Sequence, residues 1–305
     1  MPKIDKVTAS LRTHVGQVRG HNEDFVGSWE PSTESERDDL GWLYIVADGV
    51  GGAEAGDVAS QLATEQTITH YVEDSDAENS AERLLYAIET ANDDLRQLAI
   101  ERGQGGYMAT TMCAVLIQND TAILANVGDS RGYVLHDGEL RQVTRDHSLV
   151  AQLVAEGAIT PEEAITHPRR NVILSSLGPS RDPQIDLFNV DIVDGDRLIL
   201  CSDGLNRHVS DNEIAQIIQD ASPDDAAETL VNLANARGGS DNISVAIVAM
   251  GVGGTLSGPR PVVAMPNKDA QTAGSQLTAS LWLYTALLAV IEAALILAVY
   301  MWLRV

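Results

Sequence analysis

Residues 44–52 consist of an apolar run that ends in an aspartate and a glycine-rich turn, residue types that can bind a metal cation. The run stops at Asp48, and three glycines follow within four residues. The apolar part predicts a buried strand, and the glycines let the backbone adopt positive φ and approach a ligand closely. A carboxylate at a strand tip, beside the Gly49 carbonyl, offers the hard oxygens that Mg²⁺ and Mn²⁺ prefer. The alternative is a simple Asp-Gly turn.

Six further polar motifs lie near the ends of apolar runs. They are residues 19–24 (Arg-Gly-His-Asn-Glu-Asp), 108–111 (Met-Ala-Thr-Thr), 128–131 (Gly-Asp-Ser-Arg), 146–148 (Asp-His-Ser), 201–205 (Cys-Ser-Asp-Gly-Leu) and 240–242 (Ser-Asp-Asn). In this order, the set resembles the metal-dependent protein phosphatases, the type 2C serine/threonine phosphatase family, in its bacterial-type form. The resemblance covers about Lys6 to Met250.

The resemblance implies a centre of two Mn or Mg ions. Asp48 would bridge the two ions, the Gly49 carbonyl would bind one of them, and Asp203 and Asp241 would complete the other. Carboxylate, carbonyl and water oxygens suit these cations. Two ions about 3.5–4 Å apart lower the pKa of a water between them. The implied reaction is in-line attack of a metal-activated water on phosphorus.

The resemblance also implies a positively charged side chain that binds the phosphate of the substrate. Arg19 matches the family's phosphate-binding arginine, and with Asp48 it is the expected catalytic pair. A guanidinium can donate to two phosphate oxygens at once. The alternative for a lone arginine is solvation at the surface, but its position three residues before Asn22 favours the functional interpretation.

Weaker contributions are implied for four more residues. Glu23 matches a position that meets metal directly or through water, and Asp129 matches a third metal site shared with Asp203. Asp24 is expected to support the ligands, and Asn242 to orient the aspartate that precedes it. The resemblance therefore allows a third ion besides the two.

The general acid is left open by the sequence. Some family members carry a histidine just after the bridging Asp-Gly pair, or four residues after its glycine, where this chain has Val50 and Ala53. A metal-bound water could serve instead. His147 and His21 are the other candidates, with a structural role and surface exposure as their respective alternatives.

The elements predicted around these motifs favour an α+β fold. Strands are expected at residues 7–15, 42–47, 112–118, 122–127, 184–190, 197–201 and 242–250, with a hairpin at 132–144. Helices are expected at 57–71, 80–100 with Ser80 as N-cap, and 149–156, and after Thr160, Ser210 and Ser222. Residues 29–39 are expected to form a surface loop. Tight turns indicate antiparallel sheets, which the resemblance sharpens to a sandwich of two sheets flanked by helices on both faces.

The overall composition excludes one class of partner. The chain of 305 residues has a net charge of −24, which argues against a nucleic-acid-binding surface because such a surface needs clustered Lys and Arg. Its length can bury a full core. Cys113 and Cys201 lie in apolar runs and are expected to be small buried residues of a reducing compartment.

Composition changes after the catalytic domain, which is expected at residues 1–250. Residues 251–280 are rich in Gly, Pro, Ser, Thr and Ala and predict a flexible linker. Residues 281–303 are mostly apolar, and at about 1.5 Å per residue they can cross a hydrocarbon core of about 30 Å. The sequence thus predicts a single-pass membrane helix, with the catalytic domain in the cytoplasm since no signal peptide is evident. Glu292 within this span would contact another membrane helix or be protonated.

Three functions are compatible with these observations. The favoured one is a membrane-tethered phosphatase that hydrolyses phosphoserine and phosphothreonine on proteins and opposes a kinase. The second is a non-catalytic module of the same fold that binds a phosphoprotein or another partner. The third is a metal-dependent hydrolase of another phosphoester, such as a nucleotide.

Overall fold

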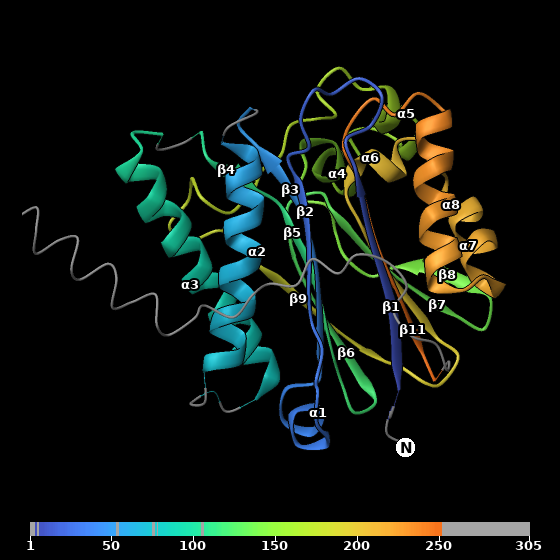
Figure 1. Ribbon diagram of the computed structural model, residues 1–305. Helices are drawn as coiled ribbons and strands as arrows, with labels where there is room; N and C mark the ends of the chain where they lie inside the picture. The colour runs from blue at the N-terminus through green and yellow to red at the C-terminus, as the bar shows by residue number, and fades with distance from the viewer. Residues whose placement is uncertain are drawn as a thin grey trace, which may run out of the picture. The chain divides into compact units, whose positions relative to one another are not determined.

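The computed structural model describes residue 4 and residues 6–52, 55–74, 77, 79–104 and 107–251. They form a sandwich of two antiparallel sheets with helices outside both (Figure 1). One sheet has the order β1 (Val7–His14), β11 (Ile243–Met250), β10 (Arg197–Cys201), β7 (Arg131–His136) and β8 (Glu139–Gln142). The other has the order β2 (Asp24–Trp29), β3 (Trp42–Val50), β5 (Met112–Gln118), β6 (Thr121–Val127) and β9 (Asp186–Asp191), with β4 (Ala109–Thr110) paired to β3.

The helices cover the two outer faces of the sandwich. Against the sheet of β2 and β3 lie α2 (Gly56–Glu73) and α3 (Ser80–Glu101). Against the other sheet lie α6 (Asp203–Asn206), α7 (Asp211–Asp220) and α8 (Pro223–Ala236). Between β8 and β9 the chain forms α4 (Leu149–Ala155) and α5 (Pro161–Thr166). The predicted sandwich with helices on both faces is confirmed.

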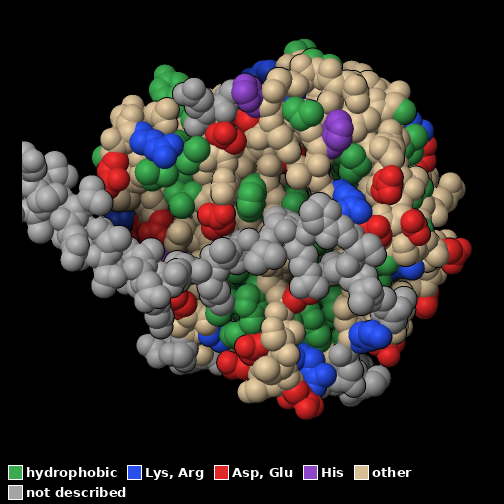
Figure 2. All heavy atoms as spheres, in the orientation of Figure 1, with side chains coloured by type: hydrophobic (Ala, Val, Ile, Leu, Met, Phe, Trp, Pro, Cys, Tyr) green, Lys and Arg blue, Asp and Glu red, His purple; other side chains and the backbone are tan. Residues whose placement is uncertain are grey.

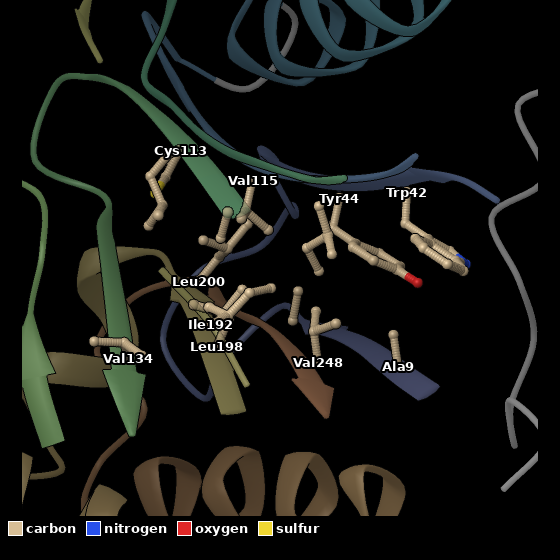
Figure 3. Close-up of a cluster of buried hydrophobic side chains, with 14 of the residues drawn as sticks. Ala9, Trp42, Tyr44, Cys113, Val115, Val134, Ile192, Leu198, Leu200 and Val248 are labelled. Atoms are coloured by element: carbon tan, nitrogen blue, oxygen red, sulfur yellow. The ribbon is translucent and has the colours of Figure 1, made fainter. Parts of the chain in front are cut away.

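Alternating side chains in the central strands separate three apolar layers. In β3, Tyr44 and Val46 enter the core between the sheets, whereas Leu43 and Ile45 pack against α2 and α3. Successive side chains of a strand point to opposite faces, so a strand covered on both sides needs a continuous apolar run. Figure 3 shows Tyr44 from one sheet and Leu200 from the other pointing into the shared core. This burial fixes the strands whose ends carry the polar motifs.

Two expectations about local structure were wrong. Residues 29–39 do not form only a loop, because α1 (Glu34–Leu40) begins within them. Thr33 and Glu36 form a capping box that satisfies the free amides of its first turn. At the start of α3, the N-cap is Asn79, whose side chain accepts from the Glu82 amide, and Ser80 is the first helical residue.

The predicted linker and membrane helix lie, apart from Gly251, outside the described residues. Within residues 4–251, where they are described, no helix is long and apolar enough to cross a membrane. Cys113 and Cys201 are buried and not bonded to each other.

Candidate active site

Five aspartates converge at the ends of strands from both sheets. Asp24 begins β2 and is the register partner of Asp48 in β3. Asp129 lies in the turn between β6 and β7, Asp203 begins α6 directly after β10, and Asp241 precedes β11. Burial raises the pKa of Asp48 well above its usual range, and the charges of the other four aspartates raise it further. The sandwich thus brings into one electrostatic cluster the carboxylates that the sequence scatters.

The backbone around Asp48 is held by two threonines. The Asp48 amide donates to Thr111 Oγ1 at 3.1 Å, and the Asp48 carbonyl accepts from Thr110 Oγ1 at 3.0 Å and from the Thr111 amide at 2.9 Å. Thr111 also shares a buried hydrogen bond of 2.8 Å with Ser130. The 108–111 and 128–131 motifs therefore position Asp48 through hydrogen bonds.

Two buried carboxylate oxygens have no hydrogen-bond partner. Ser202 Oγ donates to Asp24 Oδ2 at 2.7 Å, but Asp24 Oδ1 and Asp203 Oδ1 accept from no group in the described part of the chain. Burial raises the pKa of Asp24 to about 7, although the Ser202 hydrogen bond opposes the shift. Buried carboxylates are stable when they are paired or bind a cation. Unpartnered oxygens in such a cluster fit divalent cations.

Gly49 is required by the close approach of other backbone segments. A Cβ atom there would lie 2.1 Å from the Gly56 carbonyl oxygen and 2.5 Å from that of Glu23. The Gly49 amide donates to the Glu23 carbonyl at 3.0 Å. A Cβ at Gly56 would in turn lie 2.3 Å from Glu23 Oε2. The two glycines therefore let the 19–24 motif pack directly against the end of β3 and the start of α2.

Glu23 belongs to the edge of the cluster. Its side chain is almost buried, and burial raises its pKa while the nearby Arg19 charge opposes that rise. The sequence assigned Glu23 a weaker metal contact, and the structure places it beside Gly56, at the N-terminus of α2.

Two arginines pair with the carboxylates. Arg19 Nη2 donates to Asp241 at 2.9 Å, and Arg207 pairs with Asp203 and, at 3.3 Å, with Asp241. Burial disfavours the Arg19 charge, but Asp241, Glu23 and other acids outweigh burial and raise the pKa of Arg19. Among the described residues, no three His, Cys, Asp or Glu side chains are arranged to hold a metal ion as they stand. The guanidiniums are the cations that Asp203 and Asp241 contact.

Asn242 acts mainly on the 19–24 motif rather than on Asp241. Its Nδ2 donates to the carbonyls of Val15 and His21, each at 2.9 Å, and its Oδ1 accepts from the Glu23 amide at 2.8 Å. Only its backbone amide contacts Asp241, donating to Oδ1 at 3.0 Å. The side chain thus joins the loop that carries Arg19 to the start of β11.

Asp129 is presented by a turn that His147 stabilises. The Gly128 amide donates to His147 Nδ1 at 3.2 Å, so Nε2 carries the proton and donates to Asp186 Oδ2 at 3.1 Å. His147 is buried, and both ring nitrogens are engaged. Burial raises the pKa of Asp129 to about 7, with the Asp203 charge as the next cause. The geometry favours the structural role for His147.

A large cavity adjoins the carboxylates. Its volume is ≈ 1250 Å³, and its walls include Asp129, Asp203 and Arg207 together with residues of α4 and α5 such as Val150 and Ile165. Small-molecule pockets are about 300–1,000 Å³. The space beside the cluster is therefore large enough for a chain segment.

Sequence reasoning missed Arg207. The signal was an Asp followed four residues later by Arg, a spacing that lets side chains meet across one helical turn. The second contact, from Arg207 to Asp241, depends on tertiary structure and has no local signal. Ser202 was included in a motif, but its hydrogen bond to Asp24 was not anticipated.

Known proteins resemble the segment that forms this site. A family model described as Protein phosphatase 2C matches residues 21–243. The serine/threonine phosphatase stp of Listeria monocytogenes is 37% identical over 244 residues, which make up 79% of this chain and 94% of that protein. The protein phosphatase PhpP of Streptococcus pneumoniae is 38% identical over 244 residues, 79% of this chain and 96% of that protein.

Solved structures agree with the sequence matches. The Mycobacterium tuberculosis serine/threonine phosphatase PstP/Ppp aligns with a TM-score of 0.71 and 35% identity, covering 80% of this chain and 98% of that chain. The catalytic domain of PstP in complex with two manganese ions aligns with a TM-score of 0.68 and 34% identity, covering 80% and 98%. The family model, the sequence relatives and the solved structures agree, and the chain belongs to the protein phosphatase 2C family.

Proposed function

We propose that the chain is a metal-dependent serine/threonine protein phosphatase that hydrolyses phosphoserine and phosphothreonine in proteins. The observation that carries this proposal is the convergence of Asp48, Asp203 and Asp241 with Arg19 in a chain of this family. Relatives named as serine/threonine phosphatases support the activity.

Two Mn or Mg ions are the proposed cofactors. Asp48, the Gly49 carbonyl, Asp203 and Asp241 would hold them, because all offer hard oxygen ligands. Support comes from the unpartnered oxygen of Asp203 and from the two manganese ions in the PstP complex. When bound, such ions lower the pKa of a water and neutralise charge that develops on phosphate oxygens. Asp129 and Glu23 are proposed to contribute weaker contacts, including a third ion at Asp129 and Asp203.

Arg19 binds the phosphate of the substrate in this proposal. Its side chain is 48% exposed and already lies against Asp241, so its guanidinium is held at the mouth of the cluster. A planar guanidinium can donate to two phosphate oxygens and orient the group for in-line attack. Asn242 fixes the loop that delivers Arg19.

The cavity beside the carboxylates is the proposed place for residues that flank the phosphorylated side chain. It is lined by the apolar Val150 and Ile165 and by Arg145 and Arg170. Since His147 is buried and engaged, we propose that a water protonates the leaving serine or threonine oxygen.

Membrane attachment is a separate part of the proposal. Residues 281–303 anchor the chain as one membrane helix, and residues 251–280 act as a linker, with the catalytic domain on the cytoplasmic side. The support is composition: a run of apolar residues of spanning length, bordered by Trp and Tyr. A membrane-bound phosphatase of this kind opposes a serine/threonine kinase that acts on the same proteins.

The activity is tested by hydrolysis of a phosphothreonine peptide with manganese, comparing the unmodified chain with Asp48→Asn. We expect turnover by the unmodified chain and a loss of at least about 10²-fold in the variant, the size typical for removal of an electrostatic catalytic group. Peptide binding without turnover by the unmodified chain would support the binding module instead. Hydrolysis of nucleotides alone would support a different phosphoesterase.

A further inference from the structure

Arg207 occupies an unusual position between two carboxylates of the active site. It follows α6, and its amide donates to the Asp203 carbonyl at 3.0 Å, which fixes its backbone one turn after that aspartate. Its guanidinium then reaches both Asp203 and Asp241, which come from separate segments of the chain. The side chains of all three are mostly buried, with 25%, 13% and 16% exposed.

The two carboxylates that Arg207 contacts, Asp203 and Asp241, are also proposed metal ligands. A carboxylate oxygen that accepts from a guanidinium has fewer lone pairs for a cation, and two positive groups within a few ångströms repel each other. Arg207 and a divalent ion therefore compete for Asp203 and Asp241. Arg19 differs, because it contacts only Asp241 of this pair and is half exposed.

We propose that Arg207 is an internal counter-ion that holds Asp203 and Asp241 together in the metal-free protein and must leave them when a divalent ion binds. The inference rests on the proposed metal site. In the metal-free state the guanidinium offsets the repulsion between the two carboxylates, so the site remains folded before loading. The cost is a weaker apparent affinity for the metal, since part of the binding free energy is used to break this pairing.

The cavity beside the site has room for the displaced guanidinium of Arg207. Arg207 and the neighbouring Asn206 line the cavity of ≈ 1250 Å³, and Asp129 lines the same cavity. The charge of Arg207 already lowers the pKa of Asp129, against the larger effect of burial. A rotation of the arginine side chain towards this cavity frees both carboxylates without moving the backbone of α6.

Calorimetric titration of the metal-free, full-length chain in detergent with Mn²⁺ tests the proposal. Arg207→Gln is expected to bind Mn²⁺ about fivefold more tightly than the unmodified chain, the size expected for losing a partly exposed ion pair. The same variant is expected to have a lower Tm with chelator present and a larger rise in Tm on adding Mn²⁺.

A matched control is Arg96→Gln. Arg96 pairs with Asp93 on α3, is 29% exposed, and lies on the helical layer away from α6 (Figure 1). This control changes the net charge equally and should leave the Mn²⁺ affinity unchanged. Arg207→Lys keeps the charge but loses the fork that spans two carboxylates, so it should bind Mn²⁺ more tightly than the unmodified chain and less tightly than Arg207→Gln.

Unchanged or weaker Mn²⁺ binding by Arg207→Gln would overturn the proposal and assign the arginine a supporting role in the metal site. If Arg207→Gln does not fold, Mn²⁺ binding by Arg207→Lys is measured instead. Unchanged or weaker binding by Arg207→Lys than by the unmodified chain would then overturn the proposal. Absence of Mn²⁺ binding by the unmodified chain would contradict the proposed function itself, which separates that failure from failure of the counter-ion.

Discussion

At the scale of single residues, the site is a cluster of buried acids that share charge. Burial is the first cause of the raised pKa values of Asp24, Asp48 and Asp129, and neighbouring aspartates add to each. Such a cluster is unfavourable without cations, because each ionised group is both desolvated and close to like charges. Metal binding and stability are therefore coupled.

The metal-free protein should lose stability as the pH rises from about 4 to 7. The pKa of Asp24 is about 7 in the folded state and that of an unfolded aspartate is about 3.9. Between these values the folded state binds more protons than the unfolded state, so the free energy of unfolding falls with increasing pH. Urea denaturation with chelator at several pH values measures this slope.

Asp24→Asn tests whether Asp24 causes this decrease in the free energy of unfolding with pH. The amide stays neutral at all these pH values, and its oxygen can still accept from Ser202. The variant should show a shallower decrease of stability with pH. An equal slope in both proteins would show that Asp24 does not carry the effect.

Gly49→Ala tests the close approach at the end of β3. The added Cβ would meet backbone carbonyls of Gly56 and Glu23 at 2.1 and 2.5 Å, and backbone atoms cannot turn aside as a side chain can. We expect the free energy of unfolding to fall by about 1–3 kcal/mol. Gly20→Ala is the control, since a Cβ there meets nothing within 4 Å. Equal stability of the two variants would refute the packing argument.

At the scale of elements, the site depends on loops that are tied together across the sandwich. Asn242, before β11, bonds to Val15, His21 and Glu23 and so fixes the loop between β1 and β2. These hydrogen bonds join the ends of two different sheets, because β1 belongs to one sheet and β2 to the other.

Asn242→Ala should destabilise the protein by about 1–3 kcal/mol, since it leaves a buried amide and two carbonyls without their partner. It should also weaken phosphopeptide binding, because Arg19 is then less well positioned. Asn235→Ala is the control: Asn235 lies in α8, is partly exposed, and accepts one solvent-exposed hydrogen bond from Gln17 of the loop between β1 and β2. Thermal unfolding and the KM for a phosphopeptide measure both effects, and equal values for the two variants would contradict this role.

Much of the element pattern could be predicted from the sequence because the cues are local. Apolar runs gave the central strands, and the Asp137-Gly138 pair gave the turn between β7 and β8. The helix α1 was missed because its sequence is mostly polar and only the capping box of Thr33 and Glu36 signals it. A cap one residue from the expected position, as at Asn79, is a difference that local patterns do not resolve.

The candidate site was predicted less completely, because side-chain contacts depend on tertiary structure. The acidic motifs and Arg19 were identified from residue type and order, and the fold brings them together. The bridging position of Arg207 requires knowing that α6 and the segment before β11 are adjacent. The direction of the Asn242 side chain, which points to the 19–24 motif, likewise has no signal in the sequence.

At the scale of the whole molecule, charge and the C-terminal segment determine the expected surroundings. The net charge is −24, and Figure 2 shows acidic side chains spread over the visible face among fewer basic ones. Long-range repulsion of nucleic acid and of anionic lipid surfaces follows from this charge. In the proposed arrangement, attachment to a membrane comes from the apolar segment, residues 281–303.

Removal of residues 281–305 tests that attachment. The truncated chain should move from the membrane fraction to the soluble fraction, because the only apolar run of spanning length in the sequence is then absent. Its phosphatase activity should match that of the full chain, since every proposed site residue lies before residue 251, in the part of the chain that is kept. A truncated chain that stays with the membrane would contradict the predicted anchor.

The most direct measurement of the central claim is anomalous diffraction at the manganese edge from a crystal grown with excess Mn²⁺. The account predicts two strong peaks bounded by Asp48, the Gly49 carbonyl, Asp203 and Asp241, with Arg207 turned away from them. A structure at the same manganese concentration with no peak among these residues, and with Arg207 still pairing Asp203 to Asp241, would contradict it.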